Sequence, residues 1–300
     1  MSAEIQFIGR ALNSASHITL ENGDFVLLIE QNGRLIEKVY DGDELKDQRM
    51  VVRGVKEGAT AGYAISNDRI QALYFDSDGS IKASEFDPDS EEWDDGELEG
   101  LDDVGVHPQS NLTIAGLPGS NFVIYQASDG SIETQGKALE SECWSEKFTV
   151  PGAAALGTPI AGFSTDKAFV VSFIGDDNMI HAHSRDFDSG DWTEETLPSS
   201  SFDEEVKNLI VAQDTGELEA YVLAGTTIYH VRKDGKQETI ATLGADGDFV
   251  PTGNAEAYGI NYGNYYRYPD SDGYGGTSHG YSLLPCPTQQ TPSWPNYPSY

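Results

Sequence analysis

Basic residues are scarce in this 300-residue chain: 18 lysines and arginines stand against 50 aspartates and glutamates, a net charge of −32 at pH 7. A surface this negative repels phosphate backbones and anionic lipid headgroups, so we expect neither nucleic acid nor a membrane as partner. No apolar run approaches the roughly 18 residues that a membrane-spanning helix needs. The N-terminus lacks the basic start and the apolar stretch of a signal peptide, so we expect a cytoplasmic protein.

Cysteine is almost absent as well. Cys143 and Cys286 are too few for a disulfide framework or a cysteine-based zinc site. We also find no glycine-rich phosphate loop, no nucleophile elbow and no zinc-binding His–Glu helix motif. His181 and His183 would share one face of a strand, a spacing that suits a metal, but no third ligand is evident. The sequence therefore predicts no metal site and no cofactor.

A repeated hairpin is the main positive signal. In five segments an apolar strand, a turn and a second apolar strand follow one another. The second strand of each segment starts at an aliphatic residue, which we call the anchor, and successive anchors are 46 to 51 residues apart. Four of the units carry Asn-Gly, Asp-Gly or Asp-Asn just before the anchor, pairs that tolerate the positive φ angles of a two-residue hairpin turn. The anchors are Leu35, Ile81, Ile132, Ile180 and Ile228, and the aromatic or aliphatic residues seven positions earlier are Leu28, Tyr74, Tyr125, Phe173 and Tyr221.

A sixth, fainter unit follows at Tyr268 and Asp272-Gly273. Units of this length with three or four strands each are typical of a β-propeller, so we predict an all-β, six-bladed β-propeller with about 48 residues per blade. Blades bury their faces only against neighbours, which makes residues 1–284 one domain and residues 285–300 a Pro-rich tail. We expect residues 4–9 to form the outer strand of the sixth blade and to close the ring. The sequence leaves the oligomeric state open.

The repeat, closest from Tyr125 to Ile132 and at Cys143-Trp144, resembles the six-bladed fungal fucose-specific lectins. The resemblance implies sugar pockets between adjacent blades, each with an arginine and a glutamate that hold the sugar hydroxyls and aromatic rings that stack on it. Among the positions that match this glutamate, only position 37 holds a glutamate, Glu37. The missing arginines predict that fucose binding has been lost. The positions that match the arginine hold Phe25, Gln71, Phe122, Val170, Leu218 and Tyr265.

Apolar side chains in these positions suit a small apolar or aromatic ligand. Our first hypothesis is a small-molecule enzyme of fungal secondary metabolism, by fold-level analogy with the hetero-Diels–Alderases of tropolone-sesquiterpenoid biosynthesis. Such an enzyme dehydrates a hydroxymethyl tropolone to a quinone methide and adds it to a terpene alkene without a cofactor. Candidate catalytic residues are His17, Tyr63 and His230, and candidate substrate-binding residues are Phe25, Glu37, Phe122, Trp144, Trp192, Tyr258, Tyr262 and Tyr265.

Two other functions stay open. A cytosolic lectin of altered carbohydrate specificity explains the absent signal peptide equally well, but explains the absent arginines less well. A scaffold that binds a protein partner on one face of the ring is the third. The sequence does not identify the substrate, nor does it say whether a site lies between blades or in the central channel.

Overall fold

The computed structural model describes residues 3–252 except 21–22, 67–68, 102–103, 118, 142, 215–216 and 245–248. Within these residues the chain forms one helix, α1 (Ala3–Leu12), and five antiparallel sheets. The first two sheets contain β1 (Ser16–Thr19), β2 (Phe25–Glu30), β3 (Arg34–Asp41), β4 (Glu44–Arg53), β5 (Ala61–Ser66), β6 (Arg69–Phe75), β7 (Ile81–Asp87) and β8 (Glu92–Gly96). The third and fourth contain β9 (Leu112–Leu117), β10 (Ser120–Gln126), β11 (Ile132–Ala138), β12 (Glu146–Val150), β13 (Ile160–Ser164), β14 (Ala168–Ile174), β15 (Ile180–Asp186) and β16 (Trp192–Thr196). The fifth contains β17 (Val206–Asp214), β18 (Glu217–Ala224), β19 (Thr227–Arg232), β20 (Gln237–Leu243) and β21 (Phe249–Pro251).

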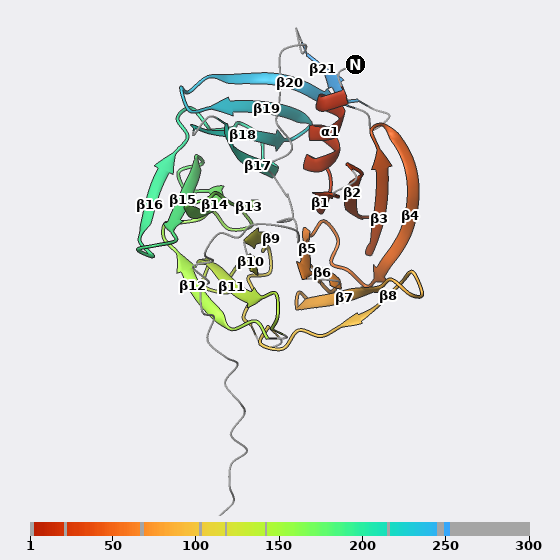
Figure 1. Cartoon of the computed structure of the whole chain (residues 1–300). Helices are drawn as coiled ribbons and strands as arrows, with labels where there is room; N and C mark the ends of the chain where they lie inside the picture. Colours follow the sequence, from red (N-terminus) through yellow and green to blue (C-terminus); the bar gives the residue numbers. More distant parts are fainter. Residues whose placement is uncertain are drawn as a thin grey trace, which may run out of the picture.

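The five sheets stand around a common axis as the blades of a β-propeller (Figure 1). In each blade the strands follow one another in sequence order, from an inner strand near the axis to an outer strand at the rim. The inner strands are β1, β5, β9, β13 and β17, and neighbouring blades meet along them. This arrangement confirms the β-propeller prediction.

The predicted anchors form the blade cores. Leu35, Ile81, Ile132, Ile180 and Ile228 are all buried, as are the aromatic or aliphatic residues seven positions earlier. Each large apolar cluster contains residues of two consecutive blades, for example the second and third, or the fourth and fifth. A single blade therefore does not bury its own faces, which is why the repeat closes as a unit.

The turns differ between blades. The first blade has the expected two-residue turn, in which Asn32 and Gly33 both have positive φ angles and Gln31 and Arg34 exchange hydrogen bonds. In the second to fourth blades the loop is one residue longer, and only its third residue has a positive φ angle, as at Gly79. Such three-residue loops need one left-handed residue, so Asp-Gly fits both turn types and does not distinguish them.

The expected N-terminal strand is wrong: residues 4–9 lie in α1. Alternation of apolar residues in Glu4-Ile-Gln-Phe suggests a strand, but the helical period places two apolar faces on the same segment. One face packs on the fifth blade and the other on the first, so α1 fills the seam between them (Figure 1). The first face consists of Ile5, Ile8 and Leu12, and the second of Phe7 and Ala11.

Polar contacts attach α1 to both neighbours. The Gln6 side-chain amide donates to the Phe249 carbonyl at 2.9 Å, and Asn208 of β17 donates to the Leu12 carbonyl at 3.1 Å. On the other side, the Arg10 guanidinium lies over the Tyr40 ring of the first blade at 4.6 Å. The helix thus takes the closing role that we expected of a strand.

The predicted sixth blade, and the boundary between a domain at 1–284 and a tail at 285–300, lie outside the described residues. Five blades are described. No helix in the described part of the chain is long and apolar enough to cross a membrane.

Candidate functional site

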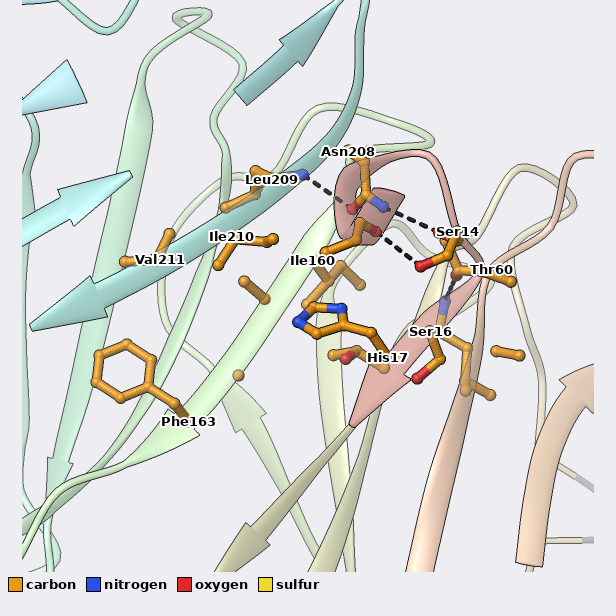
Figure 2. A pocket seen from close by; sticks show the side chains of 17 residues that line it. Ser14, Ser16, His17, Thr60, Ile160, Phe163, Asn208, Leu209, Ile210 and Val211 are labelled. Carbon is orange, nitrogen blue, oxygen red and sulfur yellow. Dashed lines mark hydrogen bonds between the residues drawn. The ribbon is translucent and has the colours of Figure 1, made fainter. Parts of the chain in front are cut away.

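A cavity of about 50 Å³, open to solvent, lies between the five inner strands (Figure 2). Seventeen residues line it, and they come from all five inner strands, the segments that precede them and the end of α1. The inner strands correspond to the short apolar stretches that precede each hairpin in the sequence. Their convergence on one axis gives them a common space, which no repeat unit forms alone.

Apolar and polar groups share the cavity wall about equally. Ile160 and Phe163 come from β13, and Leu209, Ile210 and Val211 come from β17 (Figure 2). Small residues complete it: Ala11, Ala15, Ala61, Ala161 and Gly162. Small side chains on converging strands leave the space open, because none of them reaches across the axis.

The polar groups of the wall are largely held by the protein itself. Asn208 donates to the carbonyls of Leu12 and Ser14, and its own side-chain oxygen accepts from the Leu209 amide. The Thr60 hydroxyl accepts from the Leu112 amide at 2.6 Å (Figure 2). These bonds fix the wall, so its shape is set before any ligand arrives.

His17, at the centre of the close-up in Figure 2, comes from β1 and lines the cavity. It is half-buried, and its ring centroid lies 5.9 Å from that of Phe25. Burial lowers the pKa of His17 from its ordinary value of 6.5 to about 4. The imidazole is therefore neutral at pH 7 and has one donor and one acceptor nitrogen. Among the described residues that line the cavity, it is the sole titratable side chain.

The crevice between the third and fourth blades, where the lectin resemblance places a sugar pocket, is filled by aromatic rings. Phe122 lies 5.5 Å from Phe148 and 5.2 Å from Phe169, between ring centroids, and Phe148 lies 5.9 Å from Trp192. A Cβ at Gly136 would come within 2.7 Å of the Phe122 ring. Phe122 and Trp192 are thus brought together as packing residues, and their assignment as ligand contacts stays a prediction.

The crevice between the first and second blades holds a buried polar pair. The Tyr63 hydroxyl donates to the Glu37 carboxylate at 2.8 Å, and the Arg49 guanidinium lies 3.3 Å from the same carboxylate. Burial raises the pKa of Glu37 above its ordinary value, although the Tyr63 hydrogen bond and the Arg49 charge act in the other direction. Sequence reasoning missed Arg49, which comes from the outer strand β4 and not from the Phe25 position.

Between the second and third blades, Gln71 donates to Glu85 at 3.0 Å, directly across the β6–β7 hairpin. Lys137 of β11 donates to Gln71 at 3.5 Å, and its ammonium lies 5.9 Å from the ring centre of buried Trp144. Protein groups therefore occupy this crevice too. The ligand-stacking role expected for Trp144 stays a prediction.

His230, the third candidate catalytic residue, is buried in the fifth blade. Its Nε2 atom lies 2.7 Å from a Glu219 carboxylate oxygen, and its ring stacks on Tyr221 at 4.5 Å between centroids. His230 and Tyr63 are not among the residues that line the axial cavity. Of the three candidates, His17 alone faces it, while Tyr258, Tyr262 and Tyr265 lie outside the described residues.

No protein-family model and no curated protein matches this chain. Solved structures of lectins are similar to it. The AofleA protein of Arthrobotrys oligospora has 15% identity and a TM-score of 0.58, over 81% of this chain and 76% of that one. The six-bladed Aleuria aurantia lectin has 17% identity and a TM-score of 0.56, over 78% and 80%. The BP39L lectin of Burkholderia pseudomallei has 12% identity and a TM-score of 0.52, over 72% and 64%. The chain thus has the fold of the fucose-lectin-like β-propellers.

Proposed function

We propose that this protein is a small-molecule enzyme whose substrate lies in the axial cavity. The reaction class that fits is a cofactor-free hetero-Diels–Alder cycloaddition that joins a tropolone to a sesquiterpene. The observation that carries the proposal is a cavity between the five inner strands that has both apolar and polar groups in its wall, among them one neutral imidazole. Sites for small organic molecules are typically concave, with apolar side chains and a few well-placed polar groups in the wall.

The filled crevices support the same conclusion. Residues at the positions matching the lectin arginine are apolar in four of the five described blades, and all five are buried. A sugar needs several polar groups that are free to bind its hydroxyls. In the three crevices between the first and fourth blades, the corresponding space is occupied by side chains that contact each other. The axis is therefore the better place for a ligand. The five positions are Phe25, Gln71, Phe122, Val170 and Leu218.

The chemistry needs little from the protein. Loss of water from a hydroxymethyl tropolone transfers the ring hydroxyl proton to the departing hydroxide and leaves a quinone methide. A neutral imidazole can accept one proton and donate another, which is the role that we give to His17. The quinone methide then supplies the carbon–oxygen diene, and the terpene alkene closes the new ring.

The orientation of the two reactants contributes more to the rate acceleration than the proton transfers do. Two reactants that are held in near-attack geometry gain about 7–11 kcal/mol at most over free encounter. Ile160, Phe163 and Ile210 would hold the hydrocarbon and exclude water, while His17 contacts the oxygenated end. Reactivity of the quinone methide with water makes this exclusion important for yield.

The test is to incubate the purified chain with a hydroxymethyl tropolone and a sesquiterpene alkene and to quantify the adduct by liquid chromatography and mass spectrometry. Thr113→Trp fills the cavity and should abolish the acceleration. Thr239→Trp, the same change on an exposed part of β20, is the matched control and should retain it. His17→Gln should lower kcat more than it raises KM.

Adduct formation that is unchanged in Thr113→Trp would overturn the axial site. Absence of any acceleration, together with saturable binding to a glycan array that free sugar competes away, would instead identify a lectin of altered specificity.

A further inference from the structure

The fourth blade brings together three metal-ligating side chains. His181 and His183 alternate along β15, and β16 pairs with it so that Glu194 lies directly opposite His183. Residues two apart on a strand share a face, and an opposite residue shares it with them. The pairing thus supplies the third ligand that the sequence did not reveal.

The three side chains are close enough to share one ion. One ligand atom of each lies within 4.8 Å of the other two, and in the described part of the chain no other group of histidine, cysteine and acidic residues does this. Ligand atoms of a tetrahedral zinc ion are about 3.3 Å apart, as zinc–ligand bonds of about 2.0–2.1 Å require. Small rotations of the three side chains, of which Glu194 is the most exposed, would close that difference.

His181 is oriented in the way that metal-ligating histidines are. Its Nε2 atom lies 2.9 Å from the Asp177 carboxylate, and its Nδ1 atom lies 2.7 Å from Glu194. A metal-bound imidazole commonly donates its other N–H to a carboxylate, which fixes the ring and strengthens the ligand. Asp177 is in place to do this.

His183 supplies an independent observation. It is 1% exposed, and its Nε2 atom is buried without a hydrogen-bond partner. Buried polar atoms nearly always have a partner, so an imidazole left in this state calls for an explanation. A bound cation would give the ring the partner that it lacks.

Two glycines make room for these rings. A Cβ at Gly175 would lie 2.7 Å from His181 and 2.8 Å from the Asp177 carboxylate, and a Cβ at Gly152 would lie 2.9 Å from His183 Nε2. The corresponding turn positions of the second and third blades hold Asp76 and Ala127. The fourth blade thus has space for imidazoles where its neighbours have side chains.

We propose that His181, His183 and Glu194 form a zinc site, with Asp177 positioning His181. Two imidazoles and one carboxylate are a ligand set that zinc takes, and they leave a fourth position for water or an anion. Glu194 is 51% exposed at its side chain, so the ion enters from solvent. None of the four residues lines the axial cavity, and the proposal is independent of the proposed reaction.

The experiment uses the full chain without a histidine tag, freed of metal by a chelator and then dialysed. Titration with Zn²⁺ alone, followed by calorimetry, should show one saturable site per chain, and Zn²⁺ should raise the melting temperature. Co²⁺ in place of Zn²⁺ should give the visible absorption of a four- or five-coordinate ion with nitrogen ligands.

Variants distinguish Zn²⁺ binding at the proposed ligands from nonspecific Zn²⁺ binding to surface histidines. His183→Ala and Glu194→Gln should each lose the saturable site, and Asp177→Asn should weaken Zn²⁺ about 10–100-fold. His107→Ala, a half-exposed histidine of the third blade, is the control and should bind like the wild type. Glu194→Gln changes one exposed side chain and keeps the fold, which circular dichroism checks.

A chain that binds no Zn²⁺ at micromolar concentration overturns the proposal. So does binding that persists in both His183→Ala and Glu194→Gln.

Discussion

The axial cavity and the crevices between the blades are formed by the same five sheets, but their contents differ. In the crevices, large or long side chains meet, as Phe122, Phe148 and Phe169 do between the third and fourth blades. Around the axis, alanine and glycine from several strands leave a cavity of about 50 Å³ that opens to solvent. The comparison teaches that a chain can share the fold of the lectin β-propellers while its open space lies on the axis. The following predictions test it.

The largest effect should come from the filled crevice. Phe122→Ala removes a buried ring from an aromatic cluster, and such truncations cost about 3–5 kcal/mol of unfolding free energy. Denaturant titration measures it. Leu45→Ala, on the outer strand β4 where the residue is 45% exposed, is the control and should change little. A stable Phe122→Ala protein would mean that the crevice is loosely packed.

A smaller loss is expected at the first crevice. Tyr63→Phe removes the hydroxyl that donates to buried Glu37 and leaves that carboxylate with Arg49. Loss of a hydrogen bond to a buried charged group costs about 1–3 kcal/mol. The double variant Tyr63→Phe, Glu37→Gln should recover part of the lost unfolding free energy, because an uncharged glutamine in place of Glu37 costs less to bury without the Tyr63 donor. If the losses of unfolding free energy in the two single variants simply add in the double variant, Tyr63 and Glu37 do not interact.

The cavity should show its own pH dependence. His17 has a folded pKa of about 4 and an ordinary value of 6.5, so between these values the unfolded chain binds a proton that the folded chain does not. The stability that neutral His17 gives is therefore present above pH 6.5 and decreases as pH falls towards 4. The free energy of unfolding, measured at a series of pH values for the wild type and for His17→Gln, isolates the contribution of His17. If the two proteins lose unfolding free energy in parallel between pH 6.5 and 4, His17 does not have a lowered pKa.

The smallest effect is expected from restoring an arginine. Gln71→Arg recreates the lectin residue type opposite Glu85, but Lys137 and Trp144 already occupy that crevice. Calorimetry should detect no fucose binding in either protein. If the variant binds fucose saturably, the crevice is open and lacks only its guanidinium.

The hairpin repeat made the fold predictable. Anchors such as Ile132 and Ile180 carry the signal because every blade needs the same buried positions, so the pattern recurs at each period. The N-terminus has no such repetition. Ile5 and Phe7 fit a strand by alternation, whereas Ile5 and Ile8 fit a helix by turn spacing. Only the contacts of these residues with two different blades decide for the helix.

The candidate site was less predictable. His17 was identified from its residue type, whereas Thr60, Ile160 and Asn208 carry no chemical signal that points to a cavity. Glu194 could have been found: a hairpin centred on Asp188-Ser189 places it opposite His183. That step needs the strand register, which the sequence suggests only once the turn is known.

By itself, the sequence determined the blade period, the buried anchors and the absence of arginine from the repeated position, because each depends on residues within one repeat. The tertiary structure decided what closes the described ring between the last and first blades, where open space remains, and which side chains meet across a hairpin. These depend on distances between segments far apart in the chain, and local residue patterns do not encode them directly.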